Sequence, residues 1–124
     1  MTPACFDTRR RLLGLSVQET ADWCGVQRKT VQRWASGYSD IPDSAIERLI
    51  ALEDAMSRAV DELVALAAEK GADVIELKRY RDQPGVDASP HAAGMPAGAH
   101  AILIGWTSDA LEEAGHEVEI IWGD

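Results

Sequence analysis

Five long side chains with hydrogen-bond donors lie close together between residues 27 and 33 of the 124-residue chain. On one helix they would share the outward face, because Val31 and Trp34, spaced i and i+3, form the face that turns inward. Arg, Lys and Gln side chains at this spacing can donate hydrogen bonds to base edges and phosphates of DNA. The segment therefore predicts a DNA-contacting helix, and its base-edge candidates are Gln27, Arg28, Lys29, Gln32 and Arg33.

Residues 14–37 supply the elements that must position this helix. Ser16 can cap a first helix, and Glu19 three residues later completes a capping box. Gly25 provides a sharp turn, and Gly37 ends the second helix. Two short helices joined by a glycine-containing turn are typical of a helix-turn-helix.

The charge distribution favours a nucleic-acid partner although the whole chain is acidic. The formal net charge of −9 by itself argues against such a partner. Residues 1–41, however, carry six Lys and Arg against four Asp and Glu, a net charge of +2, so the other 83 residues carry −11. A locally basic head on an acidic body fits a DNA-binding module attached to an acidic assembly region.

One further helix is predicted before this segment. It begins at about Pro3 and runs to about Leu13, with Phe6 and Leu13 inward. Its last turn carries the arginines of residues 9–11, which suit the helix dipole. They either touch a phosphate or form a solvated basic turn, and the sequence leaves both readings open.

A long helix is predicted after this segment, because no Gly or Pro interrupts residues 43–70. Its length is up to 28 residues, roughly 40 Å. An apolar stripe with 3–4 spacing along it indicates the seam of a coiled coil, although the stripe could also pack on the chain's own C-terminal part. The stripe consists of Leu49, Leu52, Met56, Ala59, Leu63 and Leu66.

The remaining residues predict a small α/β region. A strand over residues 73–80 precedes a Pro-, Gly- and Ala-rich loop, residues 81–99, with a short helix at about residues 90–93. The apolar run at residues 100–105 predicts a buried strand, and Thr107 or Ser108 can cap a helix that ends at about Ala114. Residues 117–122 alternate as a final strand, so a small β-α-β type sheet is expected.

No cluster of residues predicts catalysis or metal binding. His91, His100 and His116 lack acidic or cysteine neighbours in such a motif, and we expect them to be exposed. Cys5 and Cys24 are isolated and are expected to be free thiols. We therefore expect no enzyme, no cofactor and no metal. Without a signal-peptide pattern or an apolar run of about 18 residues, a cytoplasmic protein with no membrane partner is expected.

The stretch from about residue 10 to residue 52 resembles the lambda-repressor/Cro superfamily, often called XRE-type. The layout over the whole chain resembles a narrower group, which holds anti-CRISPR-associated autorepressors and small bacterial proteins of unknown function. That group combines an N-terminal helix-turn-helix with a C-terminal dimerisation region. The residues that carry the first resemblance are Leu15, Ser16, Glu19, Ala21, Gly25, Val26, Thr30, Val31, Arg33, Trp34, Gly37, Ile41 and Pro42.

The superfamily resemblance implies five short helices, with the third laid in the major groove and its first residues on the bases. Val17 departs from the pattern, since many relatives have Gln there, and Cys24 stands where a larger aliphatic residue is usual. Trp23 could compensate for that lost volume. The positions that match phosphate contacts are Ser16, Val17, Gln18, Thr30, Ser36, Tyr38 and Ser39.

The expected fold is a mainly α N-terminal lambda-repressor-like helix-turn-helix domain with a long linking helix, followed by a small α+β dimerisation region. The domains are residues 1–55 and 56–124. The expected function is a sequence-specific transcriptional regulator that binds double-stranded DNA as a homodimer, with the recognition helix at Gln27–Ala35 on a palindromic operator. Dimer contacts are expected from Leu52, Met56, Leu63, Leu66, Trp106 and Trp122.

Three alternatives remain open on the sequence. The chain could be an antitoxin whose C-terminal region binds a toxin, or a protein-binding adaptor whose helix-turn-helix never meets nucleic acid. The basic face could also bind RNA.

Overall fold

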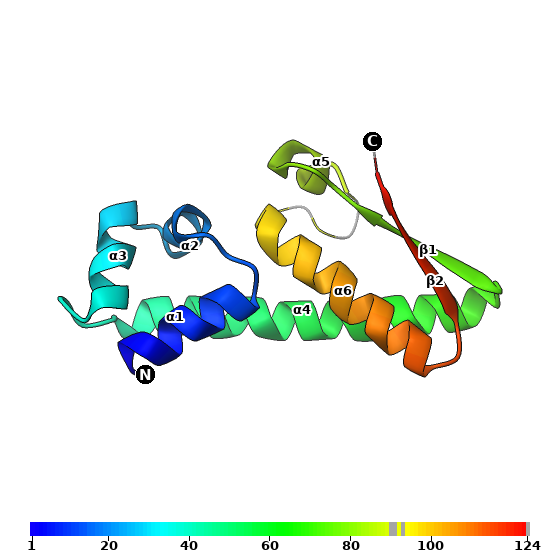
Figure 1. The fold of residues 1–124 in the computed structure, drawn as a ribbon, viewed down its shortest axis with the longest axis horizontal. Coiled ribbons are helices and arrows are strands. Elements are labelled where there is room, and N and C mark those ends of the chain that lie inside the picture. Colours follow the sequence, from blue (N-terminus) through cyan, green and yellow to red (C-terminus); the bar gives the residue numbers. More distant parts are fainter. Residues whose placement is uncertain (90–91, 93, 124) are drawn as a thin grey trace. The chain divides into compact units, whose positions relative to one another are not determined.

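The computed structural model describes residues 1–89, 92 and 94–123, and it forms two compact units, Met1–Asp54 and Ala55–Asp124. The described residues contain six helices and two strands, in the order α1–α2–α3–α4–β1–α5–α6–β2 (Figure 1). Helix α4, Asp43–Lys70, belongs to both units, because the division falls between Asp54 and Ala55.

Three short helices and the first part of α4 form the N-terminal unit. They are α1 (Pro3–Leu12), α2 (Val17–Cys24) and α3 (Arg28–Ser36). Side-chain caps set the starts of α1 and α2, whereas Gln27 at the start of α3 makes no side-chain cap hydrogen bond. At α1, Thr2 accepts a hydrogen bond from the Cys5 amide, with Pro3 in the first turn. The resemblance to the superfamily implied five short helices, whereas here α3 is followed by the 28-residue α4.

Apolar residues from all four helices and the first connecting loop fill the core of the N-terminal unit. The rings of Phe6 and Trp34 meet edge to face, with centroids 5.7 Å apart. This contact joins α1 to α3 and fixes the inward face of α3. The buried apolar residues of this unit are Phe6, Leu13, Leu15, Ala21, Val31, Trp34, Ala45, Leu49 and Leu52.

The C-terminal unit contains the rest of α4 and a β-α-β arrangement, in which β1 (Val74–Arg79) and β2 (Glu117–Trp122) pair in parallel. The connection between the strands holds α5 (Gln83–Asp87) and α6 (Ala97–Glu113). In the register of the sheet, Leu77 lies opposite Ile120 and Arg79 lies opposite Trp122. Both strands were predicted from the sequence, and their parallel pairing confirms the expected β-α-β type sheet.

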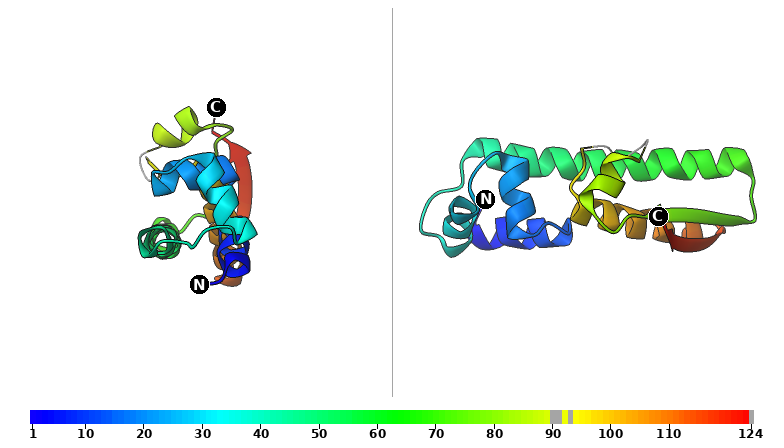
Figure 2. Two further views of the ribbon diagram at one scale, coloured as in Figure 1. Left: turned by 90° about the vertical axis from the view of Figure 1, so that its left-hand side faces the viewer. Right: turned by 90° about the horizontal axis from the view of Figure 1, so that it is seen from above.

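One apolar cluster joins helix and sheet in this unit, where α6 lies along the two strands (Figure 2). Ala67 of α4, Leu77 of β1 and Ile104 and Leu111 of α6 are buried together. The partly buried residues that pack against them are Val64, Ile75 and Val118. The face of the sheet that carries Leu77 is therefore the covered face.

The predicted strand at residues 100–105 is wrong, because these residues lie inside α6. The buried positions of α6 follow helical spacing through His100, Leu103, Ile104, Thr107 and Leu111. The helical face extends beyond this run through Thr107, which is polar but buried, so the apolar pattern of residues 100–105 alone does not show it. Thr107 and Ser108 also do not cap a new helix, since both are inside this one.

The start of α6 is fixed by a side chain that sequence reasoning did not single out. Gln83 of α5 accepts a hydrogen bond from the Ala97 amide at 2.8 Å and donates one to the Met95 carbonyl at 2.8 Å. The predicted short helix at residues 90–93 lies outside the described residues except for Ala92, which is in a turn. The short helix of this connection is instead α5.

His100 is buried, so the prediction that it is exposed is wrong. Its ring lies 5.6 Å from the Tyr80 ring, and its Nδ1 has no hydrogen-bond partner in the described part of the chain. His116 is half-buried, and His91 lies outside the described residues. None of the helices within the described ranges is long and apolar enough to cross a membrane.

Candidate nucleic-acid interface

The turn between α2 and α3 is held by main-chain hydrogen bonds. Gly25 adopts the left-handed conformation, with φ of 70°, and the Val26 amide donates to the Ala21 carbonyl at 2.9 Å. This six-to-one bond after a left-handed glycine closes α2 and sends the chain into α3. Two helices joined in this way confirm the helix-turn-helix that the sequence predicts.

Helix α3 presents one covered face and one open face. Val31 and Trp34 are buried, as predicted, and hold α3 in the core of its unit. The opposite face carries polar side chains, three of them cationic. All five base-edge candidates are exposed on it or at its start: Gln27, Arg28, Lys29, Gln32 and Arg33.

The start of α2 contains a complete capping box. The Ser16 hydroxyl accepts from the Glu19 amide at 3.0 Å, and the Glu19 carboxylate accepts from the Ser16 amide at 3.2 Å. Thr20 adds a hydrogen bond from its hydroxyl to the Ser16 carbonyl at 2.8 Å. Gln18 is exposed beside this turn, although its amide already donates to Asp22 at 2.9 Å. Val17 is half-buried and offers only its backbone amide to a phosphate.

The residues after α3 form a second tight turn. Gly37 adopts φ of 80°, and the Tyr38 amide donates to the Arg33 carbonyl at 2.9 Å. The Tyr38 side chain is 79% exposed and lies under the Arg33 guanidinium, 5.6 Å from ring centroid to Cζ. Ser36 is exposed, and Thr30 and Ser39 are half-buried. The seven phosphate candidates thus come from the α2 start, α3 and the turn after it.

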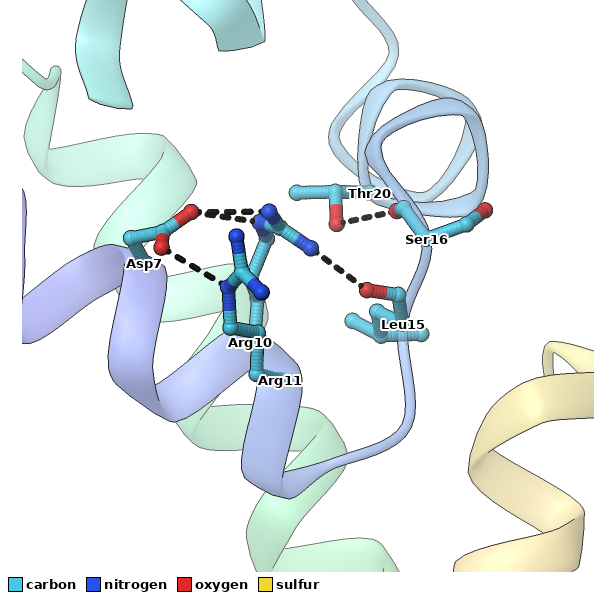
Figure 3. Close-up of polar contacts among 6 residues, drawn as sticks. All are labelled: Asp7, Arg10, Arg11, Leu15, Ser16 and Thr20. Carbon is cyan, nitrogen blue, oxygen red and sulfur yellow. Dashed lines mark hydrogen bonds and ion pairs between the residues drawn. The ribbon is translucent and has the colours of Figure 1, made fainter. Parts of the chain in front are cut away.

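Of the three arginines at the end of α1, Arg10 fits neither of the two readings that the sequence left open, because it is buried. Arg9 and Arg11 pair with acids of the same unit but keep 44% and 70% of their side chains exposed, so both readings stay open for these two. Arg10 is buried and donates to Asp7 at 2.9 Å and to the Leu15 carbonyl at 2.9 Å (Figure 3). Arg11 donates to the other oxygen of Asp7 at 2.9 Å. Arg9 pairs with Glu53 at 3.5 Å, and both side chains are partly exposed. A single acid three residues before Arg10 was the sequence signal for this network.

The Asp7 network holds the chain segment that leads into α2. Arg10 fixes the carbonyl of Leu15, the residue directly before the N-cap Ser16 (Figure 3). Burial alone would raise the pKa of Asp7, but the hydrogen bonds and charges of Arg11 and Arg10 outweigh it, so this pKa lies below its usual value. Asp7 therefore remains a carboxylate at neutral pH and keeps both arginines in place.

Trp23 and Arg48 form a second lock that sequence reasoning missed. The indole Nε1 donates to the Arg48 carbonyl at 2.9 Å, and the Arg48 Nε donates to the Trp23 carbonyl at 3.1 Å. The guanidinium also stacks on the indole, with Cζ 3.9 Å from the ring centroid. Trp23 thus connects the end of α2 to α4. The sequence suggested only that Trp23 compensates for the small volume of Cys24. Burial raises the pKa of the half-buried Cys24 thiol despite the nearby Arg48 charge.

The six dimer candidates differ in how much surface they offer. Leu52 and Met56 are almost fully buried within one chain, at 1% and 0% exposure. Leu63 and Trp106 are half-buried, whereas Leu66 is 41% exposed and Trp122 is 42% exposed. Only Leu66 and Trp122 of these six therefore present a large apolar surface to a second molecule.

The fold and the exposed face of α3 define a helix-turn-helix protein of the DNA-binding class. The family comparison specifies the class further: the model of the Aca2/YdiL-like family matches residues 1–84, and the chain belongs to this family. These are anti-CRISPR-associated helix-turn-helix proteins, a family of DNA-binding regulators and not of enzymes. Among curated proteins, no significant match was found. The described residues contain no group of three or more His, Cys, Asp or Glu placed to hold a metal ion.

Proposed function

We propose that this protein is a sequence-specific repressor that binds a palindromic operator as a homodimer and occludes a promoter, including its own. The observation that carries the proposal is the open face of α3, on which five long donor side chains are exposed while Val31 and Trp34 are buried. In a helix-turn-helix of this kind, the first turn of the second helix reaches base edges in the major groove.

The roles within the site follow from side-chain chemistry. Arg28 and Arg33 have planar guanidinium groups, which can donate two hydrogen bonds to one guanine, while Gln27 and Gln32 can pair with adenine. Lys29 is a flexible point charge and suits a phosphate or a guanine. The candidates at the start of α2 and in the turn after α3 would set the orientation on the phosphates at either side, which fixes the register of α3 without reading sequence.

The charge distribution supports this orientation on DNA. The N-terminal 41 residues carry +2 and the remaining 83 carry −11. Phosphates attract the first segment and repel the second, so only the helix-turn-helix is drawn to the duplex. A homodimer would present two copies of α3 about one helical turn of DNA apart, roughly 34 Å.

Selection of bound DNA from a random pool tests the proposal most directly. A palindromic consensus, with half-site centres about 10 base pairs apart, is the expected result. A consensus without two-fold symmetry would contradict the homodimer on the operator, and no enrichment of any DNA sequence would contradict sequence-specific binding altogether. A parallel selection on RNA shows whether the same protein prefers that partner.

Arg28→Ala tests the assignment of α3 as the recognition helix. Removal of one bidentate hydrogen-bond pair to a base should weaken binding to the selected operator by about 5- to 150-fold, corresponding to roughly 1–3 kcal/mol. Arg58→Ala is the matched control, because Arg58 is an exposed arginine on α4 in the acidic part of the chain. Binding is measured by fluorescence anisotropy, with circular dichroism to verify the fold. Equal affinity of Arg28→Ala and the parent protein would contradict this assignment.

A further inference from the structure

Strand β2 ends in an apolar run that the fold leaves partly exposed, although the Arg81 and Arg79 guanidinium groups lie over the Trp122 ring, with Cζ 4.0 and 5.0 Å from its centroid. Ile120, Ile121 and Trp122 are 48%, 37% and 42% exposed, respectively. A hollow of about 210 Å³ lies at the same place, lined by these three residues and Arg79. Three consecutive large apolar residues at the end of an edge strand are unusual on a monomer, because such an edge is a template for pairing with another strand.

The described sheet has only two strands, so β2 has a partner on one side alone. The Gly123 amide donates to the Arg79 carbonyl at 2.9 Å, which shows that the main chain of Gly123 points toward β1. Main-chain groups alternate in direction along a strand. The amides and carbonyls of Val118, Ile120 and Trp122 therefore point away from β1, toward the open edge.

The open edge of β1 is a less favourable template. Its exposed residues include Glu76, Lys78 and Arg79, and charged side chains on an edge strand oppose pairing with another strand. Strand β2 also carries the exposed Glu117 and Glu119, so the difference between the two strands lies at their ends: β1 ends in Lys78 and Arg79, whereas β2 ends in three apolar residues. Apolar residues mark the end of β2 as the surface to be covered.

From this we infer that the open edge of β2 pairs antiparallel with β2 of a second copy, giving a four-stranded sheet with the two-fold axis at Ile120. This inference rests on the homodimer of the proposed function and assigns it a surface. With Ile120 opposite Ile120 of the partner subunit, the outward main-chain groups of Val118 and Trp122 face those of the other copy's β2. An isologous interface of this kind requires a self-complementary strand.

Strand β2 meets this requirement on its covered face. Leu77 lies opposite Ile120 within one chain, so two apposed copies of Ile120 would extend the row of apolar side chains across the axis. The apolar cluster beneath Leu77 and Val118 would then continue from one subunit into the other. Burial of Ile120 on pairing accounts for its exposure in a single chain.

The solvent face of the sheet is complementary in charge. Within one chain, Glu76 lies opposite Glu119, a like-charge pair that is unfavourable in a sheet. Lys78 lies opposite Ile121. In the proposed register Ile121 of one copy faces the second copy's Glu119. Lys78 is then two strands, roughly 10 Å at the backbone, from that carboxylate, a span that the two long side chains can bridge.

The first experiment is disulfide trapping in a background with Cys5→Ala and Cys24→Ala, which removes both native thiols. Opposed residues at a hydrogen-bonded antiparallel pair have Cα atoms about 5.5 Å apart, within the range of a disulfide. Ile120→Cys should therefore give a covalent dimer on a non-reducing gel after mild oxidation. Val74→Cys is the control, because Val74 is similarly exposed at 43% but lies on β1, away from the axis.

The second experiment places a charge at the axis. Ile120→Lys opposes two ammonium groups in the dimer and should raise the dimer dissociation constant at least about a hundredfold, while Val74→Lys leaves it unchanged. Light scattering gives the mass, and circular dichroism verifies that both variants are folded. A dimer with parental affinity in Ile120→Lys, or equal trapping of both cysteine variants, overturns the inference.

The outcomes separate this inference from the proposed function. If Leu66→Glu dissociates the dimer and Ile120→Lys does not, the homodimer stands and its interface lies along α4. If the unmodified protein is a monomer at all concentrations and on its operator, both the homodimer and the interface at the β2 edge are contradicted. Sequence-specific binding by α3 is then tested by DNA selection alone.

Discussion

At the scale of single residues, some cationic side chains of the N-terminal unit are engaged in contacts within the fold, whether buried, as Arg10 is, or exposed, as Arg48 is. Arg10 is 7% exposed and satisfied by Asp7 and the Leu15 carbonyl. Arg48 is satisfied by the Trp23 carbonyl and the indole face. The cations of α3 are all exposed: Arg28 and Lys29 lie at its start and Arg33 lies in its last turn. A count of positive charges in the sequence therefore overstates how many can meet phosphate.

His100 predicts a pH dependence of stability in the C-terminal unit. Burial, with a smaller contribution from the Arg79 charge, lowers the pKa of His100 below its usual value of 6.5. The unfolded chain then binds a proton at a higher pH than the folded chain does, so the stabilisation is complete above pH 6.5 and is lost as the pH falls below it. The midpoint of thermal unfolding should therefore decrease from about pH 7.5 to about pH 5.5.

His100→Leu measures the contribution of this residue, because it removes the titrating group and keeps the site apolar. The decrease in the unfolding midpoint over the same pH interval should be smaller in His100→Leu than in the parent protein, while His116→Gln should retain the full decrease. An equal decrease in the parent and His100→Leu would show that other groups control the acid response.

At the scale of elements, the helix-turn-helix is held by short-range caps and by one longer-range lock. The capping box at Ser16 and the left-handed Gly25 are local signals, which the sequence displays openly. The contact of Trp23 with Arg48 joins residues 25 positions apart. Such a pair fixes the direction in which α2 leaves the core, so it also fixes where α3 begins.

Arg48→Met should destabilise the protein by about 1 kcal/mol, because it removes one hydrogen bond to a helix-terminal carbonyl and the stack on the indole. Met retains much of the apolar stem, so the loss reports the guanidinium. Arg58→Met, an exposed arginine on the same helix, is the control. Urea denaturation followed by tryptophan fluorescence measures the free energy of unfolding. Equal values for the two variants would show that the lock contributes no stability.

Gly25→Ala tests the turn itself. At φ of 70° an L-residue is strained, although an added Cβ would meet no atom within 4 Å. The cost should be about 1 kcal/mol in the free energy of unfolding, and Gly25→Asn should cost less, because Asn tolerates the left-handed conformation. Urea denaturation of both variants gives the comparison. If Gly25→Asn lowered the free energy of unfolding more than Gly25→Ala, the explanation by the left-handed backbone conformation would be contradicted.

At the scale of the whole molecule, the separation of charge supports the proposal that one unit binds DNA. The chain carries −9 overall, yet α3 lies in the segment with +2. The acidic remainder should be repelled by the phosphates, most strongly at low salt. Salt titrations can therefore show which cations release counterions from the duplex.

Lys29→Ala should reduce the magnitude of the slope of log K against log salt by about 0.9 for each phosphate that the variant no longer neutralises. Lys70→Ala should leave the slope unchanged, because Lys70 is an exposed lysine at the end of α4, outside the basic segment. Fluorescence anisotropy at several salt concentrations gives both slopes. The same reduction in both variants would contradict the localisation of phosphate binding to the helix-turn-helix.

The sequence by itself determined the helix-turn-helix, the long helix and the two strands, because each depends on local signals such as Ser16, Gly25 and a 28-residue stretch without Gly or Pro. It also identified the exposed face of α3, since Val31 and Trp34 define the opposite face by spacing alone.

Only the tertiary structure decided which polar side chains make contacts within the fold. It also decided that residues 100–105 are part of a helix and not a strand. Arg10, Arg48 and His100 find their surroundings through packing, and pattern alone does not separate a buried strand from part of a buried helix. The exposed end of β2 is likewise a property of the fold, because the strand pattern of residues 117–122 does not show which side chains the rest of the described chain covers.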